Sequence, residues 1–482
     1  MLFENLKFDL DREVLSSSQS KQLSQLMAVF FVGQLVGLPT LQSILTKVGI
    51  TSNLSQIRYK SLCKELTLSK IRALFESVFE LHIVNKLGEL SKKDSSCWSR
   101  ELVTVVLDDS IFKQWLEKEL ENTGVDASYF GCFFSGQFKA AVFGFKVVTL
   151  GVCIDEILYP LYFDFVKQGA KKEKKPKPKK TKEPKKIEEQ KKIEEPKKTK
   201  EPKKTKEPKK TEEPKKTEEP KKTEEPKKTE EPKKTEEPKK IEEQKAKKVA
   251  EKLVKRWGDL VKKLKILGIN LPKIHFSCDS GYSDDELAKI CEINDLIYIS
   301  VPKKSHLFLI EGKSMNLIDW IKDSFEVAEK KHQEAEKDLP KEQKTAFTYR
   351  IKAHYCSQKK DVILLAFRLN GSKKVSVIYT THLTIYAKTL RRHWFQRTYI
   401  EQFFKMLKHV LKIQEARVST KDDFEIKLMR FAYVAWHGQQ LVKFLRKKIK
   451  DFAKRGLIAV QRILNSDKEV LDLLQGILTV KY

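Results

Sequence analysis

A repeat of Lys-Lys-Thr-Glu-Glu-Pro between residues 171 and 248 constrains the fold more than any other feature of this sequence. The segment holds 11 of the chain's 16 prolines and no aromatic residue. Proline at every sixth position interrupts a long helix, and a stretch with so few apolar side chains cannot bury a core. We therefore expect residues 171–248 to form a long, disordered and solvated insert that acts as a spacer. Non-specific attraction of its lysines to DNA is the alternative role.

The charge outside this insert indicates a polyanionic partner. The whole chain of 482 residues has a net charge of +30, and the insert contributes 33 lysines and 20 glutamates to it. The other 404 residues carry 63 basic and 46 acidic side chains, a net of +17. An excess of basic residues of this size favours nucleic acid or an anionic membrane surface as the partner. Because the lysine repeat has no amphipathic apolar face to anchor it in lipid, we expect no membrane partner.

The cysteines and the apolar runs indicate a cytoplasmic, soluble protein. Seven cysteines are irregularly spaced and form no Cys-x-x-Cys pair, which predicts neither a disulfide framework nor a zinc site. The most apolar early run, Leu26–Leu38, is too short to span a bilayer and contains Gln34.

The chain before the insert divides into a helical and a β-rich part. Residues 1–98 form an expected N-terminal helical domain, with helices at about 19–36, 39–48, 53–65 and 68–90. This domain would bind DNA ends if its short helices form a helix-turn-helix unit, and an ordinary helical bundle is the alternative. Residues 99–170 then predict an antiparallel meander of three strands, at Leu102–Leu107, Phe138–Cys153 and Ile157–Val166.

After the insert the pattern alternates between helix and strand. We expect a helix at 249–266, a strand at Lys273–Cys278, a helix at 283–293 and a strand at Leu296–Val301. This order over residues 249–305 predicts an α/β fold with a mixed, partly parallel sheet and helices on its faces. A β-rich insertion follows at 306–385, with strands at Ala346–His354, Asp361–Arg368 and Lys374–Tyr379. A core helix is expected at 386–418 and C-terminal helices at 419–482.

Three acidic residues follow two of the expected strands. Asp108 and Asp109 come directly after one, and Asp279 follows another. Without the 78-residue insert, Asp108 and Asp279 are 93 residues apart, which leaves room for them to end neighbouring strands of one sheet. Each acid could instead cap a turn or a helix. The strand pattern leaves open whether Asp108 or Asp109 points inward.

A fourth acid, Glu401, lies on a helix with a polar stripe. At 100° per residue, Arg397, Lys405 and Lys408 lie within 40° of Glu401, and Trp394 joins the stripe if the helix extends that far. The opposite face carries apolar residues, namely Ile400, Phe403, Phe404, Leu407 and Leu411. An amphipathic surface helix with an ordinary Arg397–Glu401 pair is the alternative interpretation.

This stripe resembles the YREK motif, Y-x2-R-x3-E-x6-K, of bacterial insertion-sequence transposases with an RNase H-like DDE core. Arg397, Glu401 and Lys408 are in register with the motif, whereas Trp394 stands where the family has tyrosine. The resemblance covers residues 100–166 and 249–440, and the repeat insert has no counterpart in the family.

Two further segments resemble the aspartate motifs of the same family. Val106–Ser110 is similar to its first-aspartate strand, in which a small residue and then threonine or serine follow the acid, and this favours Asp108 over Asp109. Cys278–Tyr282 is similar to its second-aspartate motif. The resemblance implies that Asp108, Asp279 and Glu401 bind two Mg²⁺ ions, with Mn²⁺ as a substitute, in an RNase H-like core. A water would nick the element's end, and the freed 3′-hydroxyl would attack a second strand.

The resemblance also implies partners. DNA would be bound as terminal inverted repeats and as target, by a homodimer in the synaptic complex, so that the protein associates with the nucleoid. Arg397 and Lys408 would contact phosphates, and Trp394 would stack on a displaced base. Lys405, Lys303 and Lys304 are further DNA-binding candidates or solvated charges. The alternatives to a transposase are an RNase H-like endonuclease without strand transfer and an inactive DNA-binding relic.

Overall fold

Stretches rich in Val, Ile, Leu and Phe on both sides of the repeat insert come together in one mixed sheet of 11 strands. The structure is a computed structural model, and it describes residues 68–92, 102–113, 128–135, 140–168, 236–338, 347–369, 372–415, 418 and 420–448. All of these residues except Glu236 belong to a unit made of Met1–Gly169 and Glu237–Tyr482. Ala170–Glu236 form a separate unit.

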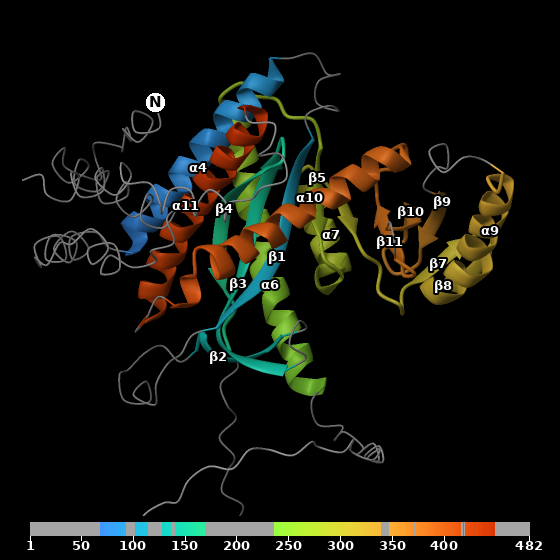
Figure 1. Cartoon of the computed structure of the whole chain (residues 1–482), viewed down its shortest axis with the longest axis horizontal. Helices are drawn as coiled ribbons and strands as arrows, with labels where there is room; N and C mark the ends of the chain where they lie inside the picture. Colours follow the sequence, from blue (N-terminus) through green and yellow to red (C-terminus); the bar gives the residue numbers. More distant parts are fainter. Residues whose placement is uncertain are drawn as a thin grey trace, which may run out of the picture. The chain divides into compact units, whose positions relative to one another are not determined.

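The helices and strands have the following bounds (Figure 1). The strands are β1 (Val103–Lys113), β2 (Phe130–Ser135), β3 (Ala140–Ile154), β4 (Ile157–Phe165), β5 (Ile274–Cys278), β6 (Leu296–Ser300), β7 (Leu307–Ile310), β8 (Lys313–Asn316), β9 (Thr348–Tyr355), β10 (Lys360–Arg368) and β11 (Val375–Thr380). The helices are α4 (Leu68–Ser91), α6 (Glu236–Ile266), α7 (Asp285–Ile293), α8 (Leu317–Trp320), α9 (Glu326–Ala335), α10 (Ala387–Lys405) and α11 (Lys421–Lys448).

The order of the strands is compatible with an RNase H-like core and confirms the expected fold class. Strands β4, β3 and β1 are antiparallel neighbours, as the predicted meander requires. Strand β1 then pairs in parallel with β5, and β5 pairs in parallel with β6. Beyond β6 the sheet continues through β11, β10, β9, β7 and β8, which are the strands of the predicted insertion. This insertion also contains α8 and α9, which the β-rich prediction for 306–385 did not include.

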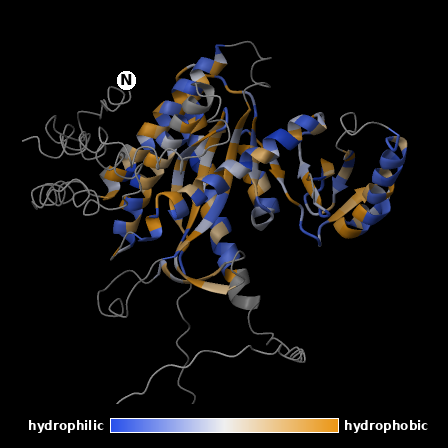
Figure 2. Ribbon diagram, in the orientation of Figure 1, coloured by the Kyte–Doolittle hydropathy of each residue, from blue (hydrophilic) through white to orange (hydrophobic). Residues whose placement is uncertain are grey.

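Helix α10 crosses one face of the sheet, over β1 and β5 (Figure 1). On that face the ring of Phe112 from β1 packs against Phe404 of α10 and Phe424 of α11. On the opposite face, Lys146 of β3 reaches Glu242 of α6. Figure 2 shows hydrophobic residues concentrated along the central strands, as expected for a sheet covered on both faces. Among the described residues, no helix has both the length and the apolar character needed to cross a membrane.

Three predicted boundaries need correction. Strand β1 does not end at Leu107 but continues to Lys113, because its pairing with β3 extends that far. The predicted insert ends too late at residue 248, because α6 already begins at Glu236 and Ala246 is buried in the core. The predicted core helix 386–418 is α10 only as far as Lys405. A π-helical turn, Met406–Val410, follows it.

The N-terminal prediction is tested only in part. Helix α4 agrees with the helix expected at 68–90, and its side chains Phe75, Phe79 and Ile83 are buried. The helices expected at 19–36, 39–48 and 53–65 lie outside the described residues, as do the repeats before Glu236.

Candidate active site

Asp108 and Asp279 lie at matching positions of two neighbouring parallel strands. In the register of β1 and β5, Leu107 is paired with Cys278, so the next residue on each strand is one of the two aspartates. Asp279 leaves β5 directly into a short 3-10 turn, whose first N–H, that of Ser280, donates to the Asp279 carboxylate at 2.7 Å. Both acids therefore stand on rigid backbone, which a precise site requires.

The alternation of side chains along a strand separates Asp108 from Asp109. Thr104 and Phe112 contact α10, so every second residue from Thr104, including Asp108, faces that helix. Asp109 faces away from α10, where the Tyr282 hydroxyl donates to its Oδ2 at 2.5 Å and Lys146 Nζ lies 3.5 Å from the same oxygen. On β5, His275 stacks on His393 of α10, and the same alternation places Asp279 on the face of Asp108.

The positive charge around Asp108 is too small to balance the negative charge of its carboxylate. Burial, with a further contribution from the Asp109 carboxylate, raises the pKa of Asp108 to about 8. Asp279 adds to this rise, and Arg397 opposes it. The Asp108 Oδ1 accepts a hydrogen bond from the backbone N–H of Asp109 at 2.8 Å. This excess of negative charge is what a bound cation would compensate.

Arg397 stands between Asp108 and Glu401. Its Nη2 lies 2.7 Å from Glu401 Oε1 and its Nη1 lies 3.8 Å from Asp108 Oδ2. Its Nε is buried and has no hydrogen-bond partner among the described residues. The Trp394 ring centre lies 4.8 Å from the guanidinium carbon, within cation–π range. Within the polar stripe expected on this helix, the Arg397–Glu401 pair is therefore present, and Arg397 also approaches Asp108.

Lys408 lies beyond the end of α10, on the π-helical turn. Its Nζ is 5.3 Å from the centre of the Phe112 ring. Burial lowers the pKa of Lys408 to about 8, although Asp109 and Asp108 act in the opposite direction. Single π-helical turns inside helices are frequent at functional sites. Lys405 is exposed one turn earlier.

The types of side chain at this site suit a hard divalent cation, but their positions do not enclose one. Asp108, Asp279 and Glu401 offer carboxylate oxygens, which Mg²⁺ prefers. In the described ranges, however, no group of three His, Cys, Asp or Glu side chains is close enough to hold a metal ion as the side chains stand. Arg397 explains this separation for Asp108 and Glu401, because its guanidinium contacts both.

Two predicted lysines form no ion pair with Asp108, Asp279 or Glu401, all of which are described residues. Lys303 and Lys304 follow β6. Lys304 is exposed, whereas burial and the charge of Lys247 lower the pKa of Lys303. Sequence reasoning missed Lys146 and Tyr282, which contact Asp109, and Glu242, which pairs with Lys146. A lysine within a run of apolar strand residues was the available signal for Lys146, because a charge rarely occupies such a position without a partner.

Comparison with known proteins does not identify a family for this chain. No protein family matches the chain, and no curated protein matches it in sequence. Among solved structures, it is similar to a piggyBac transposase in a synaptic complex with hairpin DNA, determined by cryo-EM. The two are 8% identical over 99% of this chain and 81% of that chain, with a TM-score of 0.36. A similarity at this level carries no argument about activity, so the function has to be inferred from the site itself.

Proposed function

We propose that the chain is an insertion-sequence transposase that binds the element's DNA ends and catalyses metal-dependent strand cleavage and strand transfer. One observation carries the proposal. Asp108 and Asp279 occupy matching positions on adjacent parallel strands, and both face the helix of Glu401. Arg397 lies beside Asp108 and Glu401, and Lys408 interacts electrostatically with Asp108. Acids grouped with cations in this way suit a reaction on a phosphodiester.

In this proposal Asp108, Asp279 and Glu401 hold two Mg²⁺ ions. When bound, such ions activate a water or a hydroxyl as nucleophile and stabilise the leaving oxygen. The two carboxylates that Arg397 contacts are then needed as ligands, so its guanidinium turns to a DNA phosphate near the cleaved bond. A planar guanidinium binds phosphate oxygens through two parallel hydrogen bonds. Lys408 supplies a second positive charge at the same edge of the sheet.

The proposal is tested with purified protein, Mg²⁺ and a DNA duplex that carries the element's ends. Wild type should release a 3′-hydroxyl end and join it to target DNA, and Glu401→Gln should do neither. Glu415→Gln is the matched control, because Glu415 is exposed and pairs only with Lys412 among the described residues. Cleavage without joining would identify an endonuclease. Activity of Glu401→Gln at the wild-type level would mean that the site lies elsewhere.

A further inference from the structure

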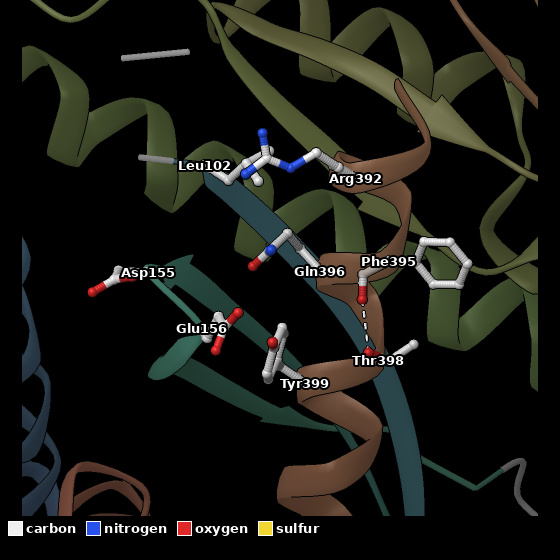
Figure 3. Close-up of a pocket in the computed structure, with 8 residues that line it drawn as sticks. All are labelled: Leu102, Asp155, Glu156, Arg392, Phe395, Gln396, Thr398 and Tyr399. Atoms are coloured by element: carbon white, nitrogen blue, oxygen red, sulfur yellow. Dashed lines mark hydrogen bonds between the residues drawn. The ribbon is translucent and has the colours of Figure 1, made fainter. Parts of the chain in front are cut away.

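A second site lies on another side of α10, between that helix and the turn that joins β3 to β4. It is a hollow of about 250 Å³ (Figure 3). Its lining includes Leu102, Asp155, Glu156, Arg392, Gln396 and Tyr399. None of these residues belongs to the acid cluster of Asp108, Asp279 and Glu401. The hollow nevertheless shares α10 with Glu401, which lies about one and a half helical turns after Gln396.

Gln396 gives this hollow a polar interior. The side chain is only 7% exposed, and its Oε1 has no hydrogen-bond partner among the described residues. Figure 3 shows the amide directed from the helix toward the β3–β4 turn. A buried carbonyl oxygen without a donor is unfavourable, so this position calls for an N–H group from a ligand.

The turn opposite Gln396 adds further acceptors. Asp155 and Glu156 are its two central residues, with φ of 49° and 65°. Two-residue hairpin turns of this kind favour Asn-Gly or Asp-Gly, because Gly, Asn and Asp adopt positive φ more readily than other residues. Lys443 pairs with Asp155, whereas Glu156 forms no ion pair with any described residue. Glu156 therefore occupies a position that favours glycine, and both carboxylates lie beside an amide that needs a donor.

Arg392 is the positive group of the hollow. It is exposed and forms no ion pair with a described residue. Its guanidinium can hold a phosphate at the surface, while Asp155 and Glu156 repel phosphate from the interior. A lysine or arginine side chain of a partner protein would satisfy the acids but would be repelled by Arg392. A nucleotide meets both conditions if its base has an amino group.

We propose that this hollow binds an unpaired nucleotide whose base carries an exocyclic amine, such as cytosine or adenine. The amine donates to Gln396 Oε1 and to the Glu156 carboxylate, the residue types that pair with adenine and cytosine amines in DNA recognition. The ring lies against Tyr399, and the phosphate lies near Arg392. The inference rests on the proposed function only in taking DNA as the partner. It adds a base-selective contact separate from the site of cleavage.

The test compares oligo-dC with oligo-dU of equal length, about 12 nucleotides, by fluorescence anisotropy of the full-length protein at one fixed salt concentration. The two strands have the same backbone and differ in the amine of cytosine and the keto oxygen of uracil. Wild type should bind oligo-dC about five- to tenfold more tightly. Gln396→Leu should abolish this preference. Gln402→Leu is the control, because Gln402 is exposed on the same helix and should leave the preference intact.

Equal affinity of wild type for the two oligonucleotides would overturn the inference, and so would a preference that survives Gln396→Leu. If Gln396→Leu does not fold, Glu156→Gly serves instead, because Glu156 is exposed on a turn and this variant removes its carboxylate acceptor, which should lower the preference. Asp108→Asn should retain the preference. Wild type that shows the preference but does not cleave DNA would refute the proposed function alone, and wild type that cleaves DNA without any preference would refute this inference alone.

Discussion

Asp108 and Asp109 are consecutive in the chain, yet their carboxylates lie on opposite faces of the central sheet. Asp108 faces α10 and lies 3.8 Å from Arg397, whereas Asp109 accepts from Tyr282 and lies 3.5 Å from Lys146. Only Asp108 therefore shares a face with Glu401. The two acids should respond differently to substitution, because one lacks a sufficient counter-charge and the other has one.

Asp108→Asn should stabilise the metal-free protein while it removes activity. The pKa of Asp108 is raised to about 8 in the folded state, above its usual value of about 4. Folded protein thus retains a proton that the unfolded chain releases, and wild type loses stability as pH rises from about 4 to about 8. The variant lacks this loss, so its free energy of unfolding at pH 8 should exceed that of wild type by about 2–5 kcal/mol. Urea unfolding of wild type and Asp108→Asn in EDTA, at pH 5 and at pH 8, measures their free energies of unfolding. If the two proteins are equally stable at both pH values, the account is contradicted.

Lys146→Met should destabilise the fold. Lys146 is buried, and its Nζ donates to Glu242 at 2.9 Å besides approaching Asp109. Without this cation two acids are left without their counter-ion, which costs about 3–5 kcal/mol. Lys146→Met with Glu242→Gln should recover part of the loss. Lys86→Met is the control, because the Lys86–Glu89 pair is exposed and contributes less than about 1 kcal/mol. Chemical denaturation compares the four proteins, and similar losses in the two single variants would refute the role given to Lys146.

The residue at which α6 begins decides how a deletion of the repeats should affect the stability of the protein. Removing residues 171–235 leaves α6 intact and should preserve the melting temperature and the DNA chemistry. Removing residues 171–248 also deletes Glu242 and Ala246, and therefore leaves Lys146 without its closest partner. We expect this longer deletion to lower the melting temperature clearly, as measured by calorimetry. Equal melting temperatures of the two deletions would show that the first part of α6 contributes nothing.

His393 should make the protein sensitive to acid. It lies on α10, where its Nδ1 is 2.8 Å from Thr104 Oγ1 and its ring stacks on His275. Burial lowers the pKa of His393 to about 2, so below about pH 6.5 the unfolded chain binds a proton that the folded protein does not. His393→Gln should reduce the stability lost between pH 7 and pH 5 by about 2 kcal/mol. His409→Gln, at an exposed position, should change nothing. Urea unfolding at both pH values tests this, and unchanged pH dependence in His393→Gln would contradict it.

Much of the sheet could be predicted from the sequence. Strands β3 to β6 and β9 to β11 lie close to their expected ranges, because β-branched and aromatic residues mark them and turn residues separate them. Strands β2, β7 and β8 were not predicted individually. The face of Asp108 could not be read from the strand pattern, because Val103–Leu107 is buried on both faces and shows no alternation. Only the resemblance favoured Asp108.

Other features depend on contacts that a linear pattern does not contain. The start of α6 has the same Lys, Glu and Pro composition as the repeats, and Pro238 is tolerated because it lies in the first helical turn. Its contact with Lys146 requires the folded sheet. The hollow around Gln396 likewise combines α10 with a turn about 240 residues earlier in the chain. No local spacing indicates such a site.

Binding of Mn²⁺ in place of Mg²⁺ tests the central claim most directly, because it requires no knowledge of the DNA sequence. Calorimetric titration should show that wild type binds Mn²⁺ and that Asp108→Asn weakens binding at least about tenfold. Asp109→Asn, measured below its melting temperature, should bind within about threefold of wild type, since Asp109 lies on the other face of β1. Undiminished binding by Asp108→Asn, or loss of binding in Asp109→Asn alone, would contradict the assignment of the metal site to the face of β1 that α10 covers.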